Sequence, residues 1–504
     1  MESILLDGVS TEITGTMTLG DLLPDMDQST VIGVIRPGTF AQETTRNLQI
    51  KTTSGEIVVE MLADPTWILK ITGPPLHYAD RNSAAFGPFV SDLAPERRPH
   101  LYERGDLILG CVGYNPTESH LVFSRTRHTA DHGAAVGGGV IGRVVSGRGV
   151  LDRWTSGDHI EAISPILSWA DTSRSFTTHD STLLLEDGMA IITHIEVTAE
   201  GYDPDGISTR TATSVEHLLL ALDSGHLTAD RVASTHLRDE RMAGSQVPSE
   251  HTKGRREGTV TVRTRGSGSG CIYIYKEDVP GIASHTVVGQ VTHGLELIKL
   301  AKARERIAIQ VTPSRFDMLG RSLDEAISSG EARGLKVTAD SEEPDRVVID
   351  QTPPTTLEVL AAGEVAFQTV PLSQVIDLIL DDQNAPDSTA IFRRLTGLFW
   401  HDIGTLPLFF TFEDVFLFKP KIPTGVLITP ENIPVERAPA AALGLTNDAR
   451  KGAGMVGIRL SENSEFGPTS EPFDGTNLIG TVINTDKLKT LKEGQIVYIR
   501  EAKR

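Results

Sequence analysis

The chain has 504 residues, 39% hydrophobic and 23% charged, which is enough for about three or four domains of ordinary size. Its 47 basic residues are outnumbered by 67 acidic ones, and the net charge of −20 disfavours binding to nucleic acid or to an anionic membrane surface. No stretch approaches the roughly 18 consecutive apolar residues of a membrane span, and the first residues lack a signal-peptide pattern. We therefore predict a cytoplasmic protein.

The first forty residues predict a small β-rich module. Two apolar runs, at 4–6 and 9–13, flank Asp7 and Gly8, which tolerate the positive φ angles of a tight hairpin turn. Thr18 is placed to cap a short helix, and the run 31–35 predicts a following strand. This order resembles the β-grasp, ubiquitin-like group, so such a module is expected over residues 1–43. Because the module does not end in a free diglycine, a docking role is favoured over sulfur-carrier chemistry.

Several later segments resemble cyclophilins. The strand pair at 48–62 resembles their opening hairpin, and the segment 376–398 resembles their strand, Ala-Pro turn and first helix. A third pattern is a strand glycine followed two residues later by valine, and it recurs at Gly142, Gly289 and Gly480. The wide and uneven spacing of this block predicts repeated or interleaved barrel domains instead of a short-period solenoid.

The expected fold is therefore mainly β with α+β parts. An N-terminal β-grasp module precedes repeated cyclophilin-like β-barrel units. The expected boundaries are a first unit at 44–200, a helical connector plus a cyclophilin-like β segment at 201–312, a small α/β insertion at 313–364 and a C-terminal barrel at 365–504. Within the connector, the charged and glycine-containing stretch 238–257 predicts a linker.

One arginine is a candidate for catalysis. Proline isomerases of the cyclophilin type use an arginine just after a Phe-His pair, beside aromatic and amide groups that line a groove. The nearest match here is Phe123-Ser124-Arg125, in which serine replaces the histidine. The C-terminal unit has Phe399-Trp400-His401 after its helix and no arginine in the matching place. We take Arg125 as the catalytic candidate and expect that the fold is kept while the active site is not.

The candidate metal ligands are few. His128 and His132 have the i, i+4 spacing that can bring two imidazoles together, but no glutamate base accompanies them, and ordinary surface or hydrogen-bonded histidines are the alternative. Cys111 and Cys271 are too few for a four-thiolate site, and Cys271 is either a buried apolar residue or a cluster-facing thiol. We predict no cofactor in the isolated chain and expect any iron–sulfur contact only at an interface with a partner.

Two glycine-rich segments do not predict nucleotide binding. The motif formed by Gly137, Gly139 and Gly142 ends among β-branched residues, where a strand is expected and no helix follows to hold a pyrophosphate. The glycines at 266, 268 and 270 lead directly into the strand-like run 271–275, which favours a hairpin over a phosphate cradle.

In this order, the segments TTSGEIVVEM, LEDGMAIITHIEV and VVIDQTPPTTLEV resemble the methanogenesis marker protein 3 family over essentially the whole chain. The resemblance implies a cytoplasmic protein of methane-metabolising archaea that belongs to the ATP-driven complex activating methyl-coenzyme M reductase. It implies the reductase and other activation subunits as partners, among them an ATPase of the ATP-binding-cassette type. The nickel tetrapyrrole and the iron–sulfur clusters of that system belong, by the same resemblance, chiefly to other subunits.

Two functions of different classes remain open from the sequence. The first is a non-catalytic scaffold or interaction subunit of this activation machinery, because binding-type folds are stacked without a convergent catalytic set. The second is a peptidyl-prolyl cis-trans isomerase or folding factor that acts on the reductase or its activators.

Overall fold

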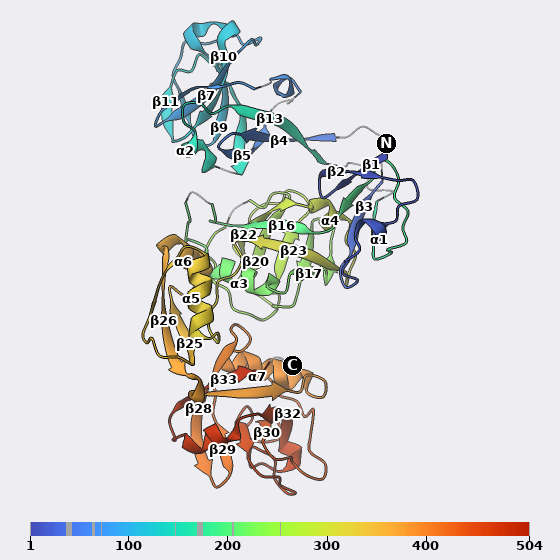
Figure 1. Ribbon diagram of the computed structural model, residues 1–504, viewed down its shortest axis with the longest axis vertical. Coiled ribbons are helices and arrows are strands. Elements are labelled where there is room, and N and C mark those ends of the chain that lie inside the picture. The colour runs from blue at the N-terminus through green and yellow to red at the C-terminus, as the bar shows by residue number, and fades with distance from the viewer. Residues whose placement is uncertain are drawn as a thin grey trace. The chain divides into compact units, whose positions relative to one another are not determined.

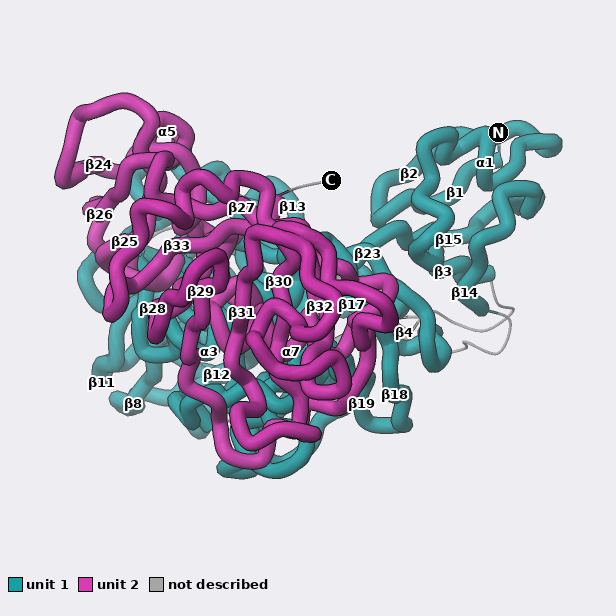
Figure 2. The backbone as a smooth tube through the Cα atoms, turned by 90° about the horizontal axis from the view of Figure 1, so that it is seen from below, with its two compact units in different colours: residues 1–314 teal, residues 315–504 magenta. Residues whose placement is uncertain are grey.

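A computed structural model describes residues 2–36, 43–62, 66–71, 73–146, 148–168, 175–203, 206–252 and 254–502. The chain divides into two compact units, 1–314 and 315–504, which Figure 2 shows in separate colours. Strands predominate in both units (Figure 1), so the prediction of a mainly β protein is confirmed. No helix in this described part of the chain is long and apolar enough to cross a membrane.

The N-terminal hairpin forms as predicted. Strands β1 (Glu2–Leu6) and β2 (Val9–Ile13) pair across a turn in which Asp7 and Gly8 have φ angles of 46° and 83°. Helix α1 (Leu19–Leu22) is capped by Thr18, whose side chain and backbone exchange hydrogen bonds with Asp21. Strand β3 (Ile32–Ile35) follows and is buried along its whole length.

Two strands from much later in the chain complete this first sheet. They are β14 (Phe176–Thr178) and β15 (Ala190–Ile192), and the sheet order is β14-β3-β15-β1-β2. Strand β15 runs parallel to β1 and antiparallel to β3. The sheet therefore needs residues beyond 1–43, and the predicted first unit of 44–200 ends too late. The reason is a long-range pairing, Leu5 with Ala190, that no local pattern encodes.

An eight-stranded sheet is inserted between β3 and β14. Its order is β13-β4-β5-β12-β9-β10-β7-β6, and the pair predicted at 48–62 is present as β4 and β5. Trp154 lies at the centre of its core with ring centroids 4.8 Å from Phe86 and 5.0 Å from Phe123. A separate two-stranded sheet joins β8 and β11. The bounds are β4 (Glu43–Thr52), β5 (Gly55–Met61), β6 (Leu76–Ala79), β7 (Ser83–Phe89), β8 (His100–Tyr102), β9 (Asp106–Cys111), β10 (Ser119–Ser124), β11 (His128–Ala130), β12 (Val140–Ser146), α2 (Val150–Arg153) and β13 (Ile160–Ser168).

The rest of unit 1 is a second eight-stranded sheet, of order β17-β23-β16-β22-β20-β21-β19-β18. Its first strand, β16, lies before the predicted boundary at 200. Arg238 belongs to β19 and Arg255 is buried, so the described residues of 238–257 are the end of β19 and part of its connection to β20, and the prediction of a linker is wrong. The bounds are β16 (Ile195–Ala199), α3 (Ala212–Leu222), β17 (His226–Thr228), β18 (Arg231–Val232), β19 (His236–Asp239), β20 (Thr259–Arg263), β21 (Ile272–Tyr275), β22 (His285–His293), α4 (Leu295–Leu300) and β23 (Arg306–Thr312).

Unit 2 begins with a small α/β part. A three-stranded sheet of order β24-β26-β25 packs with two helices around Phe316, Val348 and Phe367. Strand β26 begins at residue 364 and pairs with both β24 and β25, so it belongs to this sheet. The predicted boundary between 364 and 365 therefore lies too early, because it assigns this strand to the barrel. The bounds are α5 (Leu323–Ala332), β24 (Lys336–Ala339), β25 (Arg346–Thr352), α6 (Thr356–Ala362) and β26 (Glu364–Pro371).

The C-terminal part of unit 2 is a closed barrel of order β27-β32-β30-β31-β29-β28-β33. The parallel pairing of β27 with β33 closes it, and Phe392 of α7 packs into its core. Closure removes the unpaired edges of an open sheet. The bounds are β27 (Val375–Leu380), α7 (Pro386–Thr396), β28 (Ile403–Phe412), β29 (Val415–Phe418), β30 (Ala442–Thr446), β31 (Val456–Arg459), β32 (Thr476–Val482) and β33 (Ile496–Glu501).

Candidate functional site

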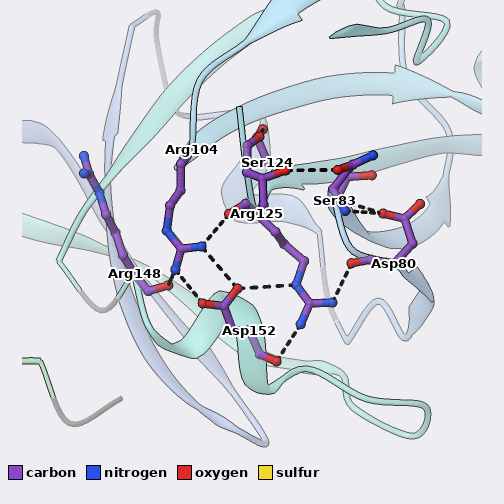
Figure 3. Close-up of polar contacts among 9 residues, drawn as sticks. Asp80, Ser83, Arg104, Ser124, Arg125, Arg148 and Asp152 are labelled. Carbon is purple, nitrogen blue, oxygen red and sulfur yellow. Dashed lines mark hydrogen bonds and ion pairs between the residues drawn. The ribbon is translucent and has the colours of Figure 1, made fainter. Parts of the chain in front are cut away.

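Arg125, the catalytic candidate, lies directly after β10 in the inserted sheet, and its guanidinium is held by the protein itself. Nη1 donates to the backbone oxygen of Asp80 at 2.8 Å, and Nη2 donates to the backbone oxygen of Asp152 at 2.5 Å. Nε lies 3.7 Å from Oδ1 of Asp152, and the side chain is only 13% exposed (Figure 3). All three nitrogens of the guanidinium thus face groups of the chain.

A second arginine tightens the same contact. Arg104 makes an ion pair of 2.5 Å with Oδ2 of Asp152 and donates to the backbone oxygens of Arg125 and Arg148. Figure 3 shows Asp152 between the two guanidinium groups. A cyclophilin-type arginine must point its donors at the substrate amide, whereas this arrangement joins β10 to the loop at residue 80 and to α2. The geometry is that of a structural tie.

His128 and His132 do meet, but not on a helix. His128 begins β11 and His132 lies in the turn after it, and their Nε2 atoms are 3.2 Å apart. Nδ1 of His128 lies 2.9 Å from the backbone oxygen of Thr126, which can only accept, so Nδ1 carries the hydrogen. Nε2 of His128 then accepts from His132. Burial, together with the neighbouring His128, lowers the pKa of His132 to about 4.

The cysteines do not join these histidines in a metal site. Sγ of Cys111 donates to the backbone oxygen of Gly133 at 3.2 Å, and burial raises the pKa of this thiol. Cys271 lies in the other eight-stranded sheet, where burial also raises its thiol pKa. In the ranges that the structure describes, no three His, Cys, Asp or Glu side chains are grouped so that they could hold a metal ion.

A second group of polar and aromatic side chains, which the sequence did not predict, lies on the second eight-stranded sheet of unit 1, the one that contains β21. Strand β21 alternates, with Ile272 and Ile274 on one face and Tyr273 and Tyr275 on the other. The register places Arg238 of β19 and Thr261 of β20 opposite Tyr273. We call this the tyrosine face and define it by His236, Arg238, Arg255, Arg263, Tyr273, Tyr275 and His285.

Hydrogen bonds link the members of the tyrosine face. Nη1 of Arg255 donates to Oη of Tyr275 at 2.5 Å, and Nδ1 of His285 lies 2.9 Å from Oγ1 of Thr261. Nη1 of Arg238 donates to Oη of Tyr273 at 3.2 Å. The two tyrosines and His285 are each no more than 5% exposed, while Arg238 and His236 lie nearer the surface. The face is therefore a buried aromatic layer with guanidinium groups along it.

The same surroundings keep the imidazoles neutral. Burial and the nearby Arg255 and Arg263 lower the pKa of His285 to about 4, and burial with Arg238 also lowers the pKa of His236. The sequence signal for this site was the Tyr-x-Tyr alternation in β21. This alternation alone does not predict the site, because the pattern of residues 238–257 predicts a linker and only the fold shows Arg238 and Arg255 beside these rings.

We expect unit 1 to lose stability as the pH falls from about 6.5 to about 4, in part through His285. In this pH window the unfolded chain binds a proton at His285 while the folded chain does not. Neutral His285 therefore contributes its full share of folding stability only above the unfolded pKa, and this share is lost as the pH falls toward the folded pKa. This lowering of the pKa of His285 corresponds to up to about 3 kcal/mol of folding stability. Hydrogen exchange of β21 and β22 peptides at pH 7 and pH 5 measures the loss. His285→Gln should flatten it, and an unchanged slope in that variant would contradict the assignment.

The closed barrel of unit 2 is the part of the chain that is similar to a described domain family. Residues 376–502, the closed barrel with α7, match a protein-family model described as "Putative peptidyl-prolyl cis-trans isomerase domain". The whole chain is similar to the UPF0288 protein of Methanosarcina barkeri, with 34% identity over 99% of this chain and 98% of that one.

The other relatives agree. UPF0288 proteins of Methanosarcina acetivorans and Methanothermobacter thermautotrophicus are 33% and 30% identical, over 100% and 99% of this chain and 97% and 98% of theirs. The chain therefore belongs to the UPF0288 family, whose members named here come from methanogenic archaea.

Proposed function

We propose that this protein is a non-catalytic interaction subunit of the machinery that activates methyl-coenzyme M reductase in methanogenesis, working in the cytoplasm as the methanogenesis marker protein 3 resemblance implies. The observation that carries the non-catalytic part is the tie at Arg125, whose three nitrogens are occupied by Asp80 and Asp152. Full-length similarity to proteins of methanogens supports the pathway. The partners in this proposal are the reductase and the other activation subunits, including an ATPase of the ATP-binding-cassette type.

The first sheet supports an interaction role. We infer that it is a β-grasp, ubiquitin-like module interrupted by the inserted sheet. Its two N-terminal strands form a hairpin, and its last strand, β15, returns between β1 and β3 and runs parallel to β1. Modules of this kind serve as docking units.

Exposed aromatic residues on the C-terminal barrel also favour binding. At the end of β28, Phe409, Phe410 and Phe412 are 54%, 45% and 60% exposed, and Ile496 of β33 is 57% exposed. Three exposed phenylalanines within four consecutive residues favour a site of protein association at the end of this strand.

Affinity purification from the native host under anaerobic conditions tests the proposal. We expect the tagged protein to bring down the reductase or its activation subunits, and the co-purifying chains to be identified by mass spectrometry. Recovery of the protein alone at every salt concentration would count against an interaction subunit. A tagged chain with Phe409→Ser and Phe412→Ser, two exposed positions, removes apolar surface and should bring down less of these partners.

The second candidate, a peptidyl-prolyl isomerase or folding factor, is favoured by the family model that matches residues 376–502. Such an enzyme accelerates the cis-trans exchange of X-Pro bonds, which takes on the order of tens to hundreds of seconds without catalysis. Exchange at the uncatalysed rate is our expectation. Activity that disappears in Arg125→Ala would favour the isomerase, and activity that survives this substitution would place the active site elsewhere.

We also propose that the isolated chain holds no iron–sulfur cluster and no stoichiometric zinc, and that contact with a partner's cluster occurs only at an interface. Cys111 and Cys271 are both buried and lie in different sheets, and the His128–His132 pair has no third ligand grouped with it in the described ranges. Elemental analysis of anaerobically purified, partner-free protein should give well under one metal per chain. One metal or more, lost on replacing Cys111, Cys271 or His128, would overturn this prediction.

A further inference from the structure

Two arginines on the tyrosine face converge on one phenol oxygen. Oη of Tyr273 accepts from Nη1 of Arg238 at 3.2 Å and lies 3.5 Å from Nη1 of Arg263. Arg238 comes from β19 and Arg263 from β20, the strands on either side of β21. Two positive groups that share one neutral acceptor repel each other, and the repulsion is strong where water is partly excluded. An anion between them would relieve it.

The carboxylates near the face balance these charges only in part, because Glu240 pairs with Arg238 and no carboxylate among the described residues pairs with Arg263. Oε1 of Glu240 is shared between Nε of Arg231, at 2.8 Å, and Arg238. Asp239 is buried and is bound by Arg241 at 2.7 Å. In the part of the chain that the structure describes, neither Arg255 nor Arg263 has a carboxylate at ion-pair distance.

This local excess of positive charge is opposite in sign to the chain as a whole, whose net charge is −20. Arg263 and Arg255 each also donate to a backbone oxygen. Nε of Arg263 donates to the backbone oxygen of Arg265 at 2.9 Å, and Arg255 donates to that of Pro280. Arg263 is partly buried, and a cation that is partly removed from water without a carboxylate partner is commonly found where a ligand supplies the missing charge.

The hydrogen-bond inventory leaves donors for that ligand. Tyr273 accepts with its oxygen, and its own hydroxyl hydrogen has no acceptor among the described residues. Nε of Arg238 is buried and likewise lacks a hydrogen-bond partner there. Buried donors of this kind are normally satisfied by protein, water or ligand.

We propose that Arg238 and Arg263 together bind a compact oxyanion, a carboxylate or a phosphate, to which the Tyr273 hydroxyl donates a third hydrogen bond. Guanidinium groups bind both kinds of anion through charge-assisted hydrogen bonds, which are stronger than those between neutral groups. The site lies at the open side of the face, since Arg238 retains 16% of its side-chain exposure while Tyr275 and His285 are covered. The proposal does not depend on which partners the protein has.

Isothermal titration of the full-length protein tests the site, with inorganic phosphate in one arm and an acetylated tri-glutamate peptide in the other, both at matched ionic strength. We expect saturable binding of at least one probe, and the tighter arm identifies phosphate or peptide carboxylate as the source of the anion. Arg238→Gln and Arg263→Gln should each weaken binding by about tenfold or more, because each removes a charged hydrogen bond. No saturable binding of either probe would overturn the proposal.

Two further variants keep the test decisive. Arg265→Gln removes one exposed positive charge from the same hairpin and should change the affinity by less than about twofold, because exposed charge is screened by salt. Tyr273→Phe keeps the ring and both arginines, so binding of the tighter probe should persist even if the Arg238 or Arg263 variant fails to fold, with a loss of at most about tenfold for one hydrogen bond. Equal loss in the Arg265 variant, or no loss in either glutamine variant, would show nonspecific attraction and contradict the site.

Discussion

Truncation after Gly475 should give a protein that aggregates and has no cooperative melting transition for its C-terminal barrel. The deletion removes β32 and β33, which carry four fully or nearly buried aliphatic residues, Ile479, Val482, Val497 and Ile499. At about 1.5 to 3 kcal/mol for each buried aliphatic side chain, their loss amounts to about 6 to 12 kcal/mol. This loss is comparable to the free energy of unfolding of a whole domain, which is roughly 5 to 15 kcal/mol.

Open edges add to this loss. Strand β27 pairs only with β32 and β33, so the truncated chain leaves it without a neighbour and exposes backbone groups on β28 and β30. Unpaired strand edges are templates for aggregation. Size-exclusion chromatography and calorimetry of the truncated chain check the result, and truncation after Ala502 is the matched control. A soluble, cooperatively melting product of the first truncation would show that β32 and β33 do not close the barrel.

Local features of the fold could be predicted from the sequence because short-range physics determines them. The Asp7-Gly8 turn and the cap at Thr18 need only the conformational preferences of a few neighbouring residues, and both are present. The return of β15 to β1 was missed for the opposite reason. Its partners are 185 positions apart, as the pair Leu5 and Ala190 shows, and neither strand's own pattern specifies the other.

The candidate sites divide in the same way. Arg125 was found from a local motif, but the motif does not reveal that Asp152, on α2, occupies its guanidinium. His128 and His132 meet as their spacing suggested, although through a strand and a turn instead of a helix face. The tyrosine face cannot be predicted from the sequence, because it is assembled by the register of β19, β21 and β20, which no local pattern specifies.

The substitution Asn477→Ala should be among the most destabilising single changes in unit 2. Asn477 is fully buried, and its Nδ2 donates to Oγ of Ser388 at 2.9 Å and to the backbone oxygen of Thr429 at 2.7 Å. Its Oδ1 accepts from the backbone N–H of Glu431 at 3.1 Å and from Nδ2 of Asn447 at 3.0 Å. One side chain thus joins α7, the loop near 430, the end of β30 and β32.

Alanine would leave these four partners buried without their hydrogen bonds, at about 1 to 3 kcal/mol for each group that stays unsatisfied. Because the effects are not additive and some groups will bind water, we expect the free energy of unfolding to fall by about 3 kcal/mol. Amide hydrogens protected by this network should then exchange about 100-fold faster. Hydrogen exchange of peptides from β30 and β32 measures it within the full-length chain. Asn463→Ala is the control, because its half-buried side chain also accepts two hydrogen bonds, from the N–H groups of Glu465 and Phe466, and these lie where water can replace them. Exchange at the wild-type rate in Asn477→Ala would mean that this network does not hold the barrel to its helix.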